Sequence, residues 1–270
     1  MRPAIINVMD SAARKAARSL IHDFGEIEQL QVSRKGPADF VSEADRRAEA
    51  ILRRELGKAR PEFSMLLEEA GAVGNPNAES RWIVDPLDGT TNFLHGIPHF
   101  AISIAHEERG ELVAGMVYEP LRDEVFWTVR GSGAFLNNRR LRVSARRDMA
   151  DAILATGVPF GDRPGKEEML AALVPVMART AGLRRFGSAA LDLAYVAAGR
   201  YEAFWEFGLA PWDVAAGILL VREAGGFVSE IGGGGDPLNG DSIIASNDAL
   251  FDAVGRMLRG AIRGKTAAER

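Results

Sequence analysis

The sequence predicts a mixed α/β protein with an α+β first half and an α/β second half. Two observations lead to this prediction. Up to about residue 145, several short apolar runs with strand character follow one another, whereas beyond it strand and helix patterns alternate. The 270 residues suffice for one large domain or for two packed subdomains. We therefore predict subdomains over residues 1–145 and 146–262, followed by a disordered tail over 263–270.

The first half begins with two predicted helices. Apolar residues at helical spacing predict an amphipathic helix over residues 4–22. The tetrapeptide Ser42-Glu43-Ala44-Asp45 has the form of a capping box and predicts a helix from Arg46 to Leu56. The strands expected after these helices are 101–105, 112–118 and 124–129, with a hairpin turn at 108–111.

The second half shows the alternation that is typical of a sheet covered by helices. Its predicted strands are 152–156, 183–186, 201–207, 226–230 and 242–245. Its predicted helices are 166–181, 188–199, 212–224 and 248–259.

Composition excludes several functional classes. The net charge of −4 argues against nucleic acid as a partner, because a phosphate backbone selects a basic surface. The chain has no cysteine, which excludes disulfides, thiolate chemistry and zinc sites built on cysteine. No apolar segment resembles a signal peptide or a membrane span. We expect a cytoplasmic protein with neither a membrane nor nucleic acid as its partner.

The most informative segment is Asp85-Pro86-Leu87-Asp88-Gly89-Thr90-Thr91-Asn92-Phe93, which directly follows the apolar stretch Trp82-Ile83-Val84. That stretch predicts the end of a buried strand. Carboxylates such as Asp85 and Asp88 are ligands that Mg²⁺, Mn²⁺ and Ca²⁺ prefer, and the proline between them restricts their separation. The Leu87 carbonyl can be turned toward the same ion. The segment therefore predicts a hard-metal site.

A phosphate site is predicted beside the metal. Gly89 permits close backbone approach, and a helix that begins near Thr90 would offer free amides and its positive dipole end to an anion. The alternative is a surface turn, because Pro-x-Asp-Gly is common turn chemistry. The buried strand in front of the nine residues favours the metal and phosphate interpretation.

Two further acidic groups each allow two interpretations. Asp213 follows Trp212 in the first turn of a predicted helix, where an acid is often only a dipole-compensating cap. Glu68 and Glu69 follow an apolar run and could form a solvated pair. Alternatively, a cation shared with other acids would relieve the repulsion between the two glutamates.

These motifs together resemble the inositol monophosphatase family, a set of magnesium-dependent, lithium-sensitive phosphomonoesterases. The similarity spans nearly the whole chain. Its most specific parts are the DPLDGTTNF run and the later WDVAAG run that begins at Trp212. Weaker similarity lies in the segments 35–45, 187–190 and 223–226, and the segment 156–161 resembles bacterial members. The resemblance implies a layered α-β-α-β-α sandwich of the inositol monophosphatase and fructose-1,6-bisphosphatase type, and a homodimer.

The resemblance also implies a set of metal ligands. Glu68, Asp85 and the Leu87 carbonyl would hold one Mg²⁺ ion, and Asp85, Asp88 and Asp213 a second. Glu68 would anchor a third, weaker ion with the help of water. Mn²⁺ is expected to substitute for Mg²⁺.

Catalytic and substrate contacts follow from the same resemblance. Thr90 and Glu68 would orient and deprotonate the attacking water, and Glu206 would contact substrate hydroxyls. Lys35 would lie near the entrance and attract the phosphate. The remaining contacts to phosphate or substrate would come from Asp88, Gly89, Thr90, Gly187, Ser188, Ala189 and Asp213.

The expected reaction is the hydrolysis of a polyol phosphate monoester, with inositol 1-phosphate as the first substrate. Fructose 1,6-bisphosphate, histidinol phosphate and nucleotide-linked phosphates are alternatives with the same chemistry. Glu206 favours a hydroxyl-rich substrate, because a carboxylate accepts hydrogen bonds from neighbouring hydroxyls. A nucleotide would need an aromatic or basic platform, and the sequence identifies none. A non-catalytic regulatory or binding protein on the same scaffold is the alternative from another class.

One position departs from the family pattern. The family usually has glycine before its paired glutamates, and this chain has Leu67. If the backbone there needs a positive φ, leucine would be strained and the geometry of Glu68 would change.

Overall fold

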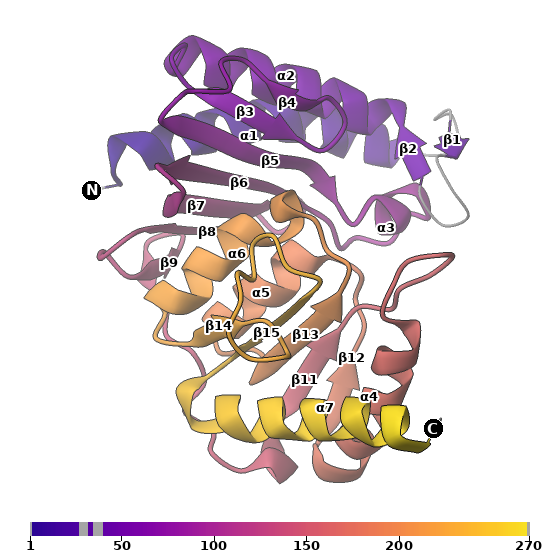
Figure 1. Cartoon of the computed structure of the whole chain (residues 1–270). Helices are drawn as coiled ribbons and strands as arrows, with labels where there is room; N and C mark the ends of the chain where they lie inside the picture. Colours follow the sequence, from indigo (N-terminus) through magenta and orange to yellow (C-terminus); the bar gives the residue numbers. More distant parts are fainter. Residues whose placement is uncertain (1, 27–31, 35–39, 269–270) are drawn as a thin grey trace.

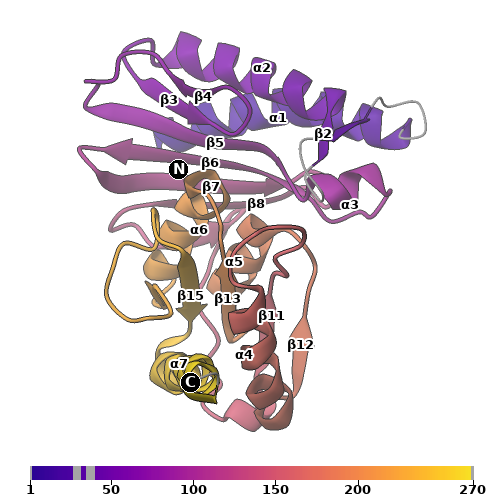
Figure 2. The same cartoon turned by 45° about the vertical axis from the view of Figure 1, so that its right-hand side comes forward.

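The computed structural model describes residues 2–26, 32–34 and 40–268. These residues build five layers in the order helices, sheet, helices, sheet, helices (Figure 1). A view turned by 45° shows the same stack, with the middle helices between the two sheets (Figure 2). The α-β-α-β-α sandwich implied by the resemblance is therefore confirmed.

The first layer consists of α1 (Ala4–Gly25) and α2 (Glu43–Ala59). Both helices are longer than predicted, and α2 follows directly on β2 (Phe40–Ser42), which pairs with β1 (Val32–Arg34). A buried stripe at helical spacing faces the first sheet, as amphipathic helices require. On α1 that stripe comprises Ile6, Met9, Ala13, Ala16, Ala17 and Leu20.

The first sheet has the strand order β10-β9-β8-β7-β6-β5-β3-β4. β3 and β5 run parallel, with Leu67 opposite Val84. Because parallel strands end at the same edge, this register places Glu68 beside Asp85. The strands are β3 (Ser64–Leu67), β4 (Gly71–Val73), β5 (Ser80–Asp88), β6 (Ala101–Glu108), β7 (Glu111–Glu119), β8 (Glu124–Val129), β9 (Ala134–Leu136) and β10 (Arg139–Arg140).

β5 does not end at Val84 as the sequence suggested, but continues to Asp88. Asp85 lies opposite Ser103 and Asp88 opposite Ala101 on β6, so β5 contains one residue more than β6 in this interval. This is a β-bulge, and Pro86 is tolerated there because it has no N–H to donate to the ladder. The bulge displaces both aspartates from a regular alternation. A short helix, α3 (Thr90–Leu94), follows at once.

The middle layer consists of α5 (Ala189–Ala197) and α6 (Pro211–Glu223), which lie between the two sheets in both views (Figures 1 and 2). Every residue of α5 is buried. α6 packs closely on the first sheet, since a Cβ atom added to Gly115 of β7 would lie 3.0 Å from the Ala216 Cα atom. The middle helices and the facing strands form one apolar core that joins the two halves.

The second sheet has the strand order β12-β11-β13-β15-β14. On β13, Phe204 faces the middle layer, whereas Ala203 and Trp205 face the last layer, as the two-residue period of a strand requires. The last layer consists of α4 (Lys166–Arg179) and α7 (Asp248–Ala268). The strands are β11 (Ile153–Thr156), β12 (Gly182–Arg184), β13 (Ala203–Phe207), β14 (Phe227–Ser229) and β15 (Ser242–Ser246).

The predicted tail is largely helical, because α7 extends from Asp248 to Ala268 instead of ending at residue 259. Ile262 packs against the core of the last layer and anchors the helix beyond the predicted end. The strands of the first sheet end at Arg140 and those of the second begin at Ile153.

Candidate active site

Carboxylates from both halves of the chain line one cavity of about 280 Å³. Glu68 follows β3, Asp85 and Asp88 lie in the bulged end of β5, and Asp213 lies in the first turn of α6. Glu206 of β13 lines the same cavity. Residues that are up to 145 positions apart in the sequence (68 to 213) thus face one space between the halves.

Asp85 and Leu87 are fixed to each other within the bulge. The Asp85 carboxylate, 2% exposed, accepts a hydrogen bond at Oδ1 from the Leu87 N–H at 2.9 Å. The Thr90 hydroxyl donates to the Leu87 carbonyl at 2.8 Å. The bulge therefore holds Leu87 from both sides, and its carbonyl oxygen retains a second lone pair for another partner.

Asp88 is held by the start of α5, in the other half of the chain. Its Oδ2 atom accepts hydrogen bonds from the Ser188 hydroxyl and, at 2.8 Å, from the Ala190 N–H. Ser188 was expected at the substrate, but it is 1% exposed and does not line the cavity. Gly187 and Ala189 do line it. Ser188 instead caps α5 and orients a carboxylate of the cavity wall.

The position of Asp213 fits both interpretations that the sequence left open. Its Oδ2 atom accepts a hydrogen bond from the Ala210 N–H at 2.7 Å, as a residue stabilising a helix start does. The carboxylate also lines the cavity beside Asp85. The cap leaves one oxygen atom for a ligand in the cavity.

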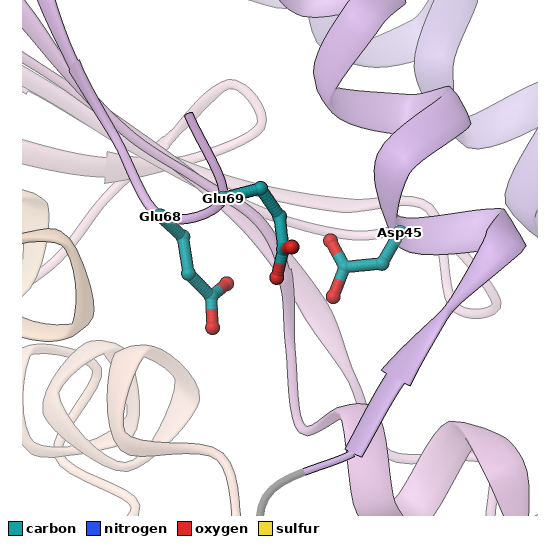
Figure 3. A group of neighbouring side chains, drawn as sticks. All are labelled: Asp45, Glu68 and Glu69. Atoms are coloured by element: carbon teal, nitrogen blue, oxygen red, sulfur yellow. The ribbon is translucent and has the colours of Figure 1, made fainter. Parts of the chain in front are cut away.

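Glu68 belongs to a second acidic group at the end of β3. Asp45, Glu68 and Glu69 each bring a carboxylate oxygen within 4.8 Å of the others. Figure 3 shows Glu69 between Glu68 and Asp45, which projects from the first turn of α2. The Glu69 N–H donates to the Glu49 carboxylate at 2.8 Å and so ties this turn to α2.

Leu67 does not strain this turn. It is a buried strand residue opposite Gly71 and Val84, and it is not among the described residues with positive φ. The backbone strain that was considered for Leu67 is therefore absent, because Leu67 adopts ordinary strand geometry and packs in the core between the first helices and the first sheet.

Burial raises the pKa of every carboxyl group in the cavity wall, and repulsion from neighbouring carboxylates adds to this at Glu68, Asp85, Glu206 and Asp213. Burial is the main cause, and it raises the pKa of Glu68 to about 9, with Asp45 and Asp213 adding repulsion. Burial and then Glu68 raise the pKa of Asp85 well above its usual range. Burial raises the pKa of Asp213 to about 7, and that of Asp88 to about 6 in spite of the hydrogen bond from Ser188. Metal-free, this wall binds protons, which is typical of carboxylates arranged for a cation.

Gly89 and Thr90 also line the cavity. Gly89 has φ +92°, and a Cβ there would lie 3.0 Å from the His99 carbonyl oxygen, so both conformation and space require glycine. α3 does begin at Thr90, but it has only five residues. Its dipole is correspondingly small, and an anion here would depend on the backbone amides themselves.

Glu206 lies in the cavity wall on the second sheet. A Cβ at Gly157 would lie 1.8 Å from its Oε1 atom, so Glu206 occupies the space that Gly157 leaves free. Burial raises the Glu206 pKa to about 8, and repulsion from Asp213 and Asp88 adds to this.

Several lining residues were not predicted from the sequence. Phe160, Arg163 and Arg185 line the cavity, and Asp45 joins the acidic group, although the sequence placed it only in a capping box and in the family-like segment 35–45. The segment 156–161 resembled bacterial relatives, which was the one signal near Phe160. Lys35, expected near the entrance, lies outside the described residues.

The five-layer sandwich with an acidic cavity between its halves is the architecture of a class of phosphoric monoester hydrolases. The chain belongs to the inositol monophosphatase family, whose family model matches residues 3–263. It is 57% identical over 253 residues to an inositol-1-monophosphatase of Mesorhizobium japonicum, covering 94% of this chain and 95% of the relative.

Other relatives differ in name. A Nus factor SuhB of Pseudomonas aeruginosa is 45% identical over 258 residues, with 94% of this chain and 95% of the relative covered. The extragenic suppressor protein suhB of Bartonella henselae superposes with a TM-score of 0.92 at 56% identity, covering 95% of this chain and 99% of that chain. In the described part of the chain, no helix combines the length and apolarity needed to cross a membrane.

Proposed function

We propose that the protein hydrolyses inositol 1-phosphate to inositol and phosphate with Mg²⁺ as its cofactor. The observation that supports this most strongly is the convergence of Glu68, Asp85, Asp88 and Asp213 on one cavity from both halves of the fold. Relatives at 53–57% identity carry the name inositol-1-monophosphatase, which supports the same substrate.

The donor set fits a hard divalent cation. All candidate ligands are oxygen atoms, and burial together with mutual repulsion raises the pKa values of Glu68 and Asp85, which favours a bound cation that would balance their charge. The Glu68 Oε2 atom is buried without a hydrogen-bond partner among the described residues. Glu68, Asp85 and the Leu87 carbonyl would hold one ion, and Asp85, Asp88 and Asp213 another. Bound ions would neutralise the phosphate dianion, lower the pKa of a water molecule and stabilise the leaving alkoxide.

The chain itself positions the reacting groups. The Thr90 hydroxyl donates its hydrogen to the Leu87 carbonyl, so its oxygen accepts a further hydrogen bond from the attacking water. Glu68 accepts the water proton as the oxygen attacks phosphorus. The bond between phosphorus and the alcohol oxygen breaks, and the alkoxide is protonated from solvent. The Gly89 and Thr90 amides would bind the phosphate.

Glu206 would select the alcohol. It lies in the cavity wall on the second sheet, whereas the β5 bulge belongs to the first, and it offers two oxygen atoms to neighbouring hydroxyls. A polyol such as inositol satisfies both atoms, whereas a simple alkyl phosphate does not.

A phosphatase assay with and without Mg²⁺ tests this function. We expect release of phosphate from inositol 1-phosphate only with Mg²⁺, and loss of at least about 10²-fold in kcat for Asp88→Asn, which removes a charge while nearly keeping the shape. Unchanged turnover in Asp88→Asn would contradict the assigned site. Negligible inositol 1-phosphate hydrolysis beside rapid hydrolysis of histidinol phosphate would overturn the substrate.

Three further properties belong to this proposal. We expect a homodimer, a cytoplasmic location and separate subdomains over 1–145 and 146–262. Light scattering on the purified protein tests the dimer. Relatives at 42–45% identity carry the name Nus factor SuhB, and a regulatory role is therefore the second candidate. Catalysis is favoured because the chain has every side chain that the proposed reaction needs: Glu68, Asp85, Asp88, Thr90 and Asp213.

A further inference from the structure

A second cavity lies in the last layer of the fold. It is lined by residues of α4 and α7, which pack against each other (Figure 1), and by residues of β13 and β15. Its volume is about 220 Å³, against about 280 Å³ for the candidate active site. Among the residues that the structure describes, the two cavities share no lining residue. The second cavity is therefore a separate place where a ligand could bind.

Three apolar side chains line this second cavity: Phe207, Ile231 and Ile262. Ile231 is 2% exposed and belongs to the core of the last layer, and the other two pack against that core. Phe207 faces this side of the sheet because neighbouring strand residues point to opposite faces, and Glu206 lines the candidate active site. An apolar lining favours a ligand with a hydrocarbon part.

The same cavity has two cationic side chains in its wall. Arg259 and Arg263 of α7 both line it, and they lie on one face of the helix because they are four residues apart. Glu168 of α4 is the one acidic residue among the described lining residues. The wall thus has one positive charge in excess, which favours an anionic group on the ligand.

Hydrogen bonds hold the polar part of this wall in place. The Arg259 Nη1 atom donates to the Ile231 carbonyl at 3.1 Å, and the Ile231 N–H donates to the Ser242 hydroxyl oxygen at 3.2 Å. Because that oxygen accepts a hydrogen bond, the Ser242 hydroxyl can donate its own hydrogen to a ligand. A wall fixed in this way needs little ordering when an anion binds.

We propose that this cavity binds a short-chain aliphatic carboxylate, with the chain on Phe207, Ile231 and Ile262 and the carboxylate at Arg259 and Arg263. A guanidinium binds a carboxylate through two parallel hydrogen bonds, whereas it repels an ammonium group and gains less from a neutral hydroxyl. The volume lies below the roughly 300 Å³ at which drug-sized sites begin, which limits the length of the chain. Binding here involves neither the carboxylate wall nor Mg²⁺, so it does not depend on the proposed phosphatase function.

Hexanoate, 1-hexanol and hexylamine form a matched set of probes, because they share one chain and differ in the charge at its end. Each is titrated into protein labelled with ¹³C at the isoleucine methyl groups, with Mg²⁺ and inorganic phosphate present to compete for the candidate active site. We expect the largest chemical-shift changes at Ile231 and Ile262. The dissociation constant for hexanoate should be lower than that for hexylamine by about 10-fold or more.

Arg263→Gln tests the charged part of the site. It should weaken hexanoate binding by about 5-fold or more and leave 1-hexanol binding unchanged. Arg256→Gln is the matched control, since Arg256 is exposed on the same helix and does not line the cavity. It should leave the binding of all three probes unchanged.

Three results would overturn the site. These are hexanoate shifts that are absent or confined to other isoleucines, equal affinities for hexanoate and hexylamine, and full hexanoate affinity in Arg263→Gln. Shifts at Ile231 and Ile262 on dilution without a probe would show that a second copy of the chain covers the cavity, and they would overturn it too.

Discussion

The side-chain amide of Asn92 donates a hydrogen bond to the Phe186 carbonyl at 2.7 Å and thereby joins the two halves of the chain. The same nitrogen donates to the His99 carbonyl at 2.9 Å. Asn92 is 6% exposed; its bond to His99 is buried, and its bond to Phe186 is partly buried. Phe186 precedes the Gly187 turn and Ser188, which holds Asp88. Asn92 therefore supports the carboxylate wall from a distance.

Asn92→Ala should destabilise the protein and weaken its activity. Loss of the amide removes the donor from the buried His99 carbonyl and from the partly buried Phe186 carbonyl, at a cost of about 1–3 kcal/mol in the free energy of unfolding. We expect a fall in kcat/KM by about 10-fold or more, measured with inositol 1-phosphate. Asn77→Ala, in an exposed loop, is the control. Wild-type stability and kcat/KM in Asn92→Ala would show that the contact contributes nothing.

Ser188→Ala should weaken metal binding more than it weakens the fold. The substitution removes the hydroxyl hydrogen bond that orients Asp88 and leaves the Ala190 N–H in place. We expect the Mn²⁺ dissociation constant, measured by electron paramagnetic resonance, to rise by about 10-fold. Ser132→Ala, at an exposed turn, should leave it unchanged. Equal dissociation constants in both variants would refute an orienting role for Ser188.

Gly157→Ala should impair recognition of the alcohol. The added methyl group would overlap the Glu206 carboxylate, since the two atoms would lie 1.8 Å apart. We expect KM for inositol 1-phosphate to rise by about 10-fold, while the Mn²⁺ dissociation constant stays within about 2-fold. Gly232→Ala is the matched control, because a Cβ there meets nothing within 4 Å. A KM unchanged by Gly157→Ala would exclude Glu206 from substrate recognition.

The metal-free protein should lose stability as pH rises. The pKa values of Glu68, Asp85, Asp88 and Asp213 are raised in the folded state, so between about pH 4 and 9 the folded protein binds more protons than the unfolded chain. By linkage, stability then decreases with rising pH over this window. We expect Tm without metal to fall by about 5 °C or more from pH 6 to 9.

Mg²⁺ should offset that loss, and by more at pH 9 than at pH 6, because cations compete with protons for the same carboxylates. Scanning calorimetry at both pH values, with and without Mg²⁺, measures the difference. A stabilisation by Mg²⁺ that is independent of pH would show that the ion binds elsewhere. Asp213→Asn should reduce the pH dependence, because it removes one titrating group and its repulsion of Glu68 and Asp85.

The metal-ligand motif could be predicted from the sequence because its residues are neighbours in the chain. Asp85, Asp88 and Gly89 lie within five residues of one another, and their spacing already indicates metal ligands. Partners that meet only through the fold were not predictable. Ser188 reaches Asp88 across 100 positions, and Arg163 lies in the connection between β11 and α4.

In the fold, too, features set by local sequence were predicted and features set by pairing between strands were not. Long amphipathic helices and alternating strands were predicted, because each buries one face at a regular period. The strands β3 and β4 were missed, since they are short and depend on pairing with β5 and with each other. The bulge at Asp85–Asp88 was missed as well, because a bulge is a mismatch between two strands and not a property of one.

We propose that carboxylates from both halves of the chain form one cation site. An anomalous difference map from crystals soaked in Mn²⁺ tests it most directly. We predict peaks within coordination distance of Asp85, Asp88 and Asp213, and their loss in Asp213→Asn crystals. A map without a peak at these three carboxylates, at Mn²⁺ concentrations that support full turnover, would contradict the account.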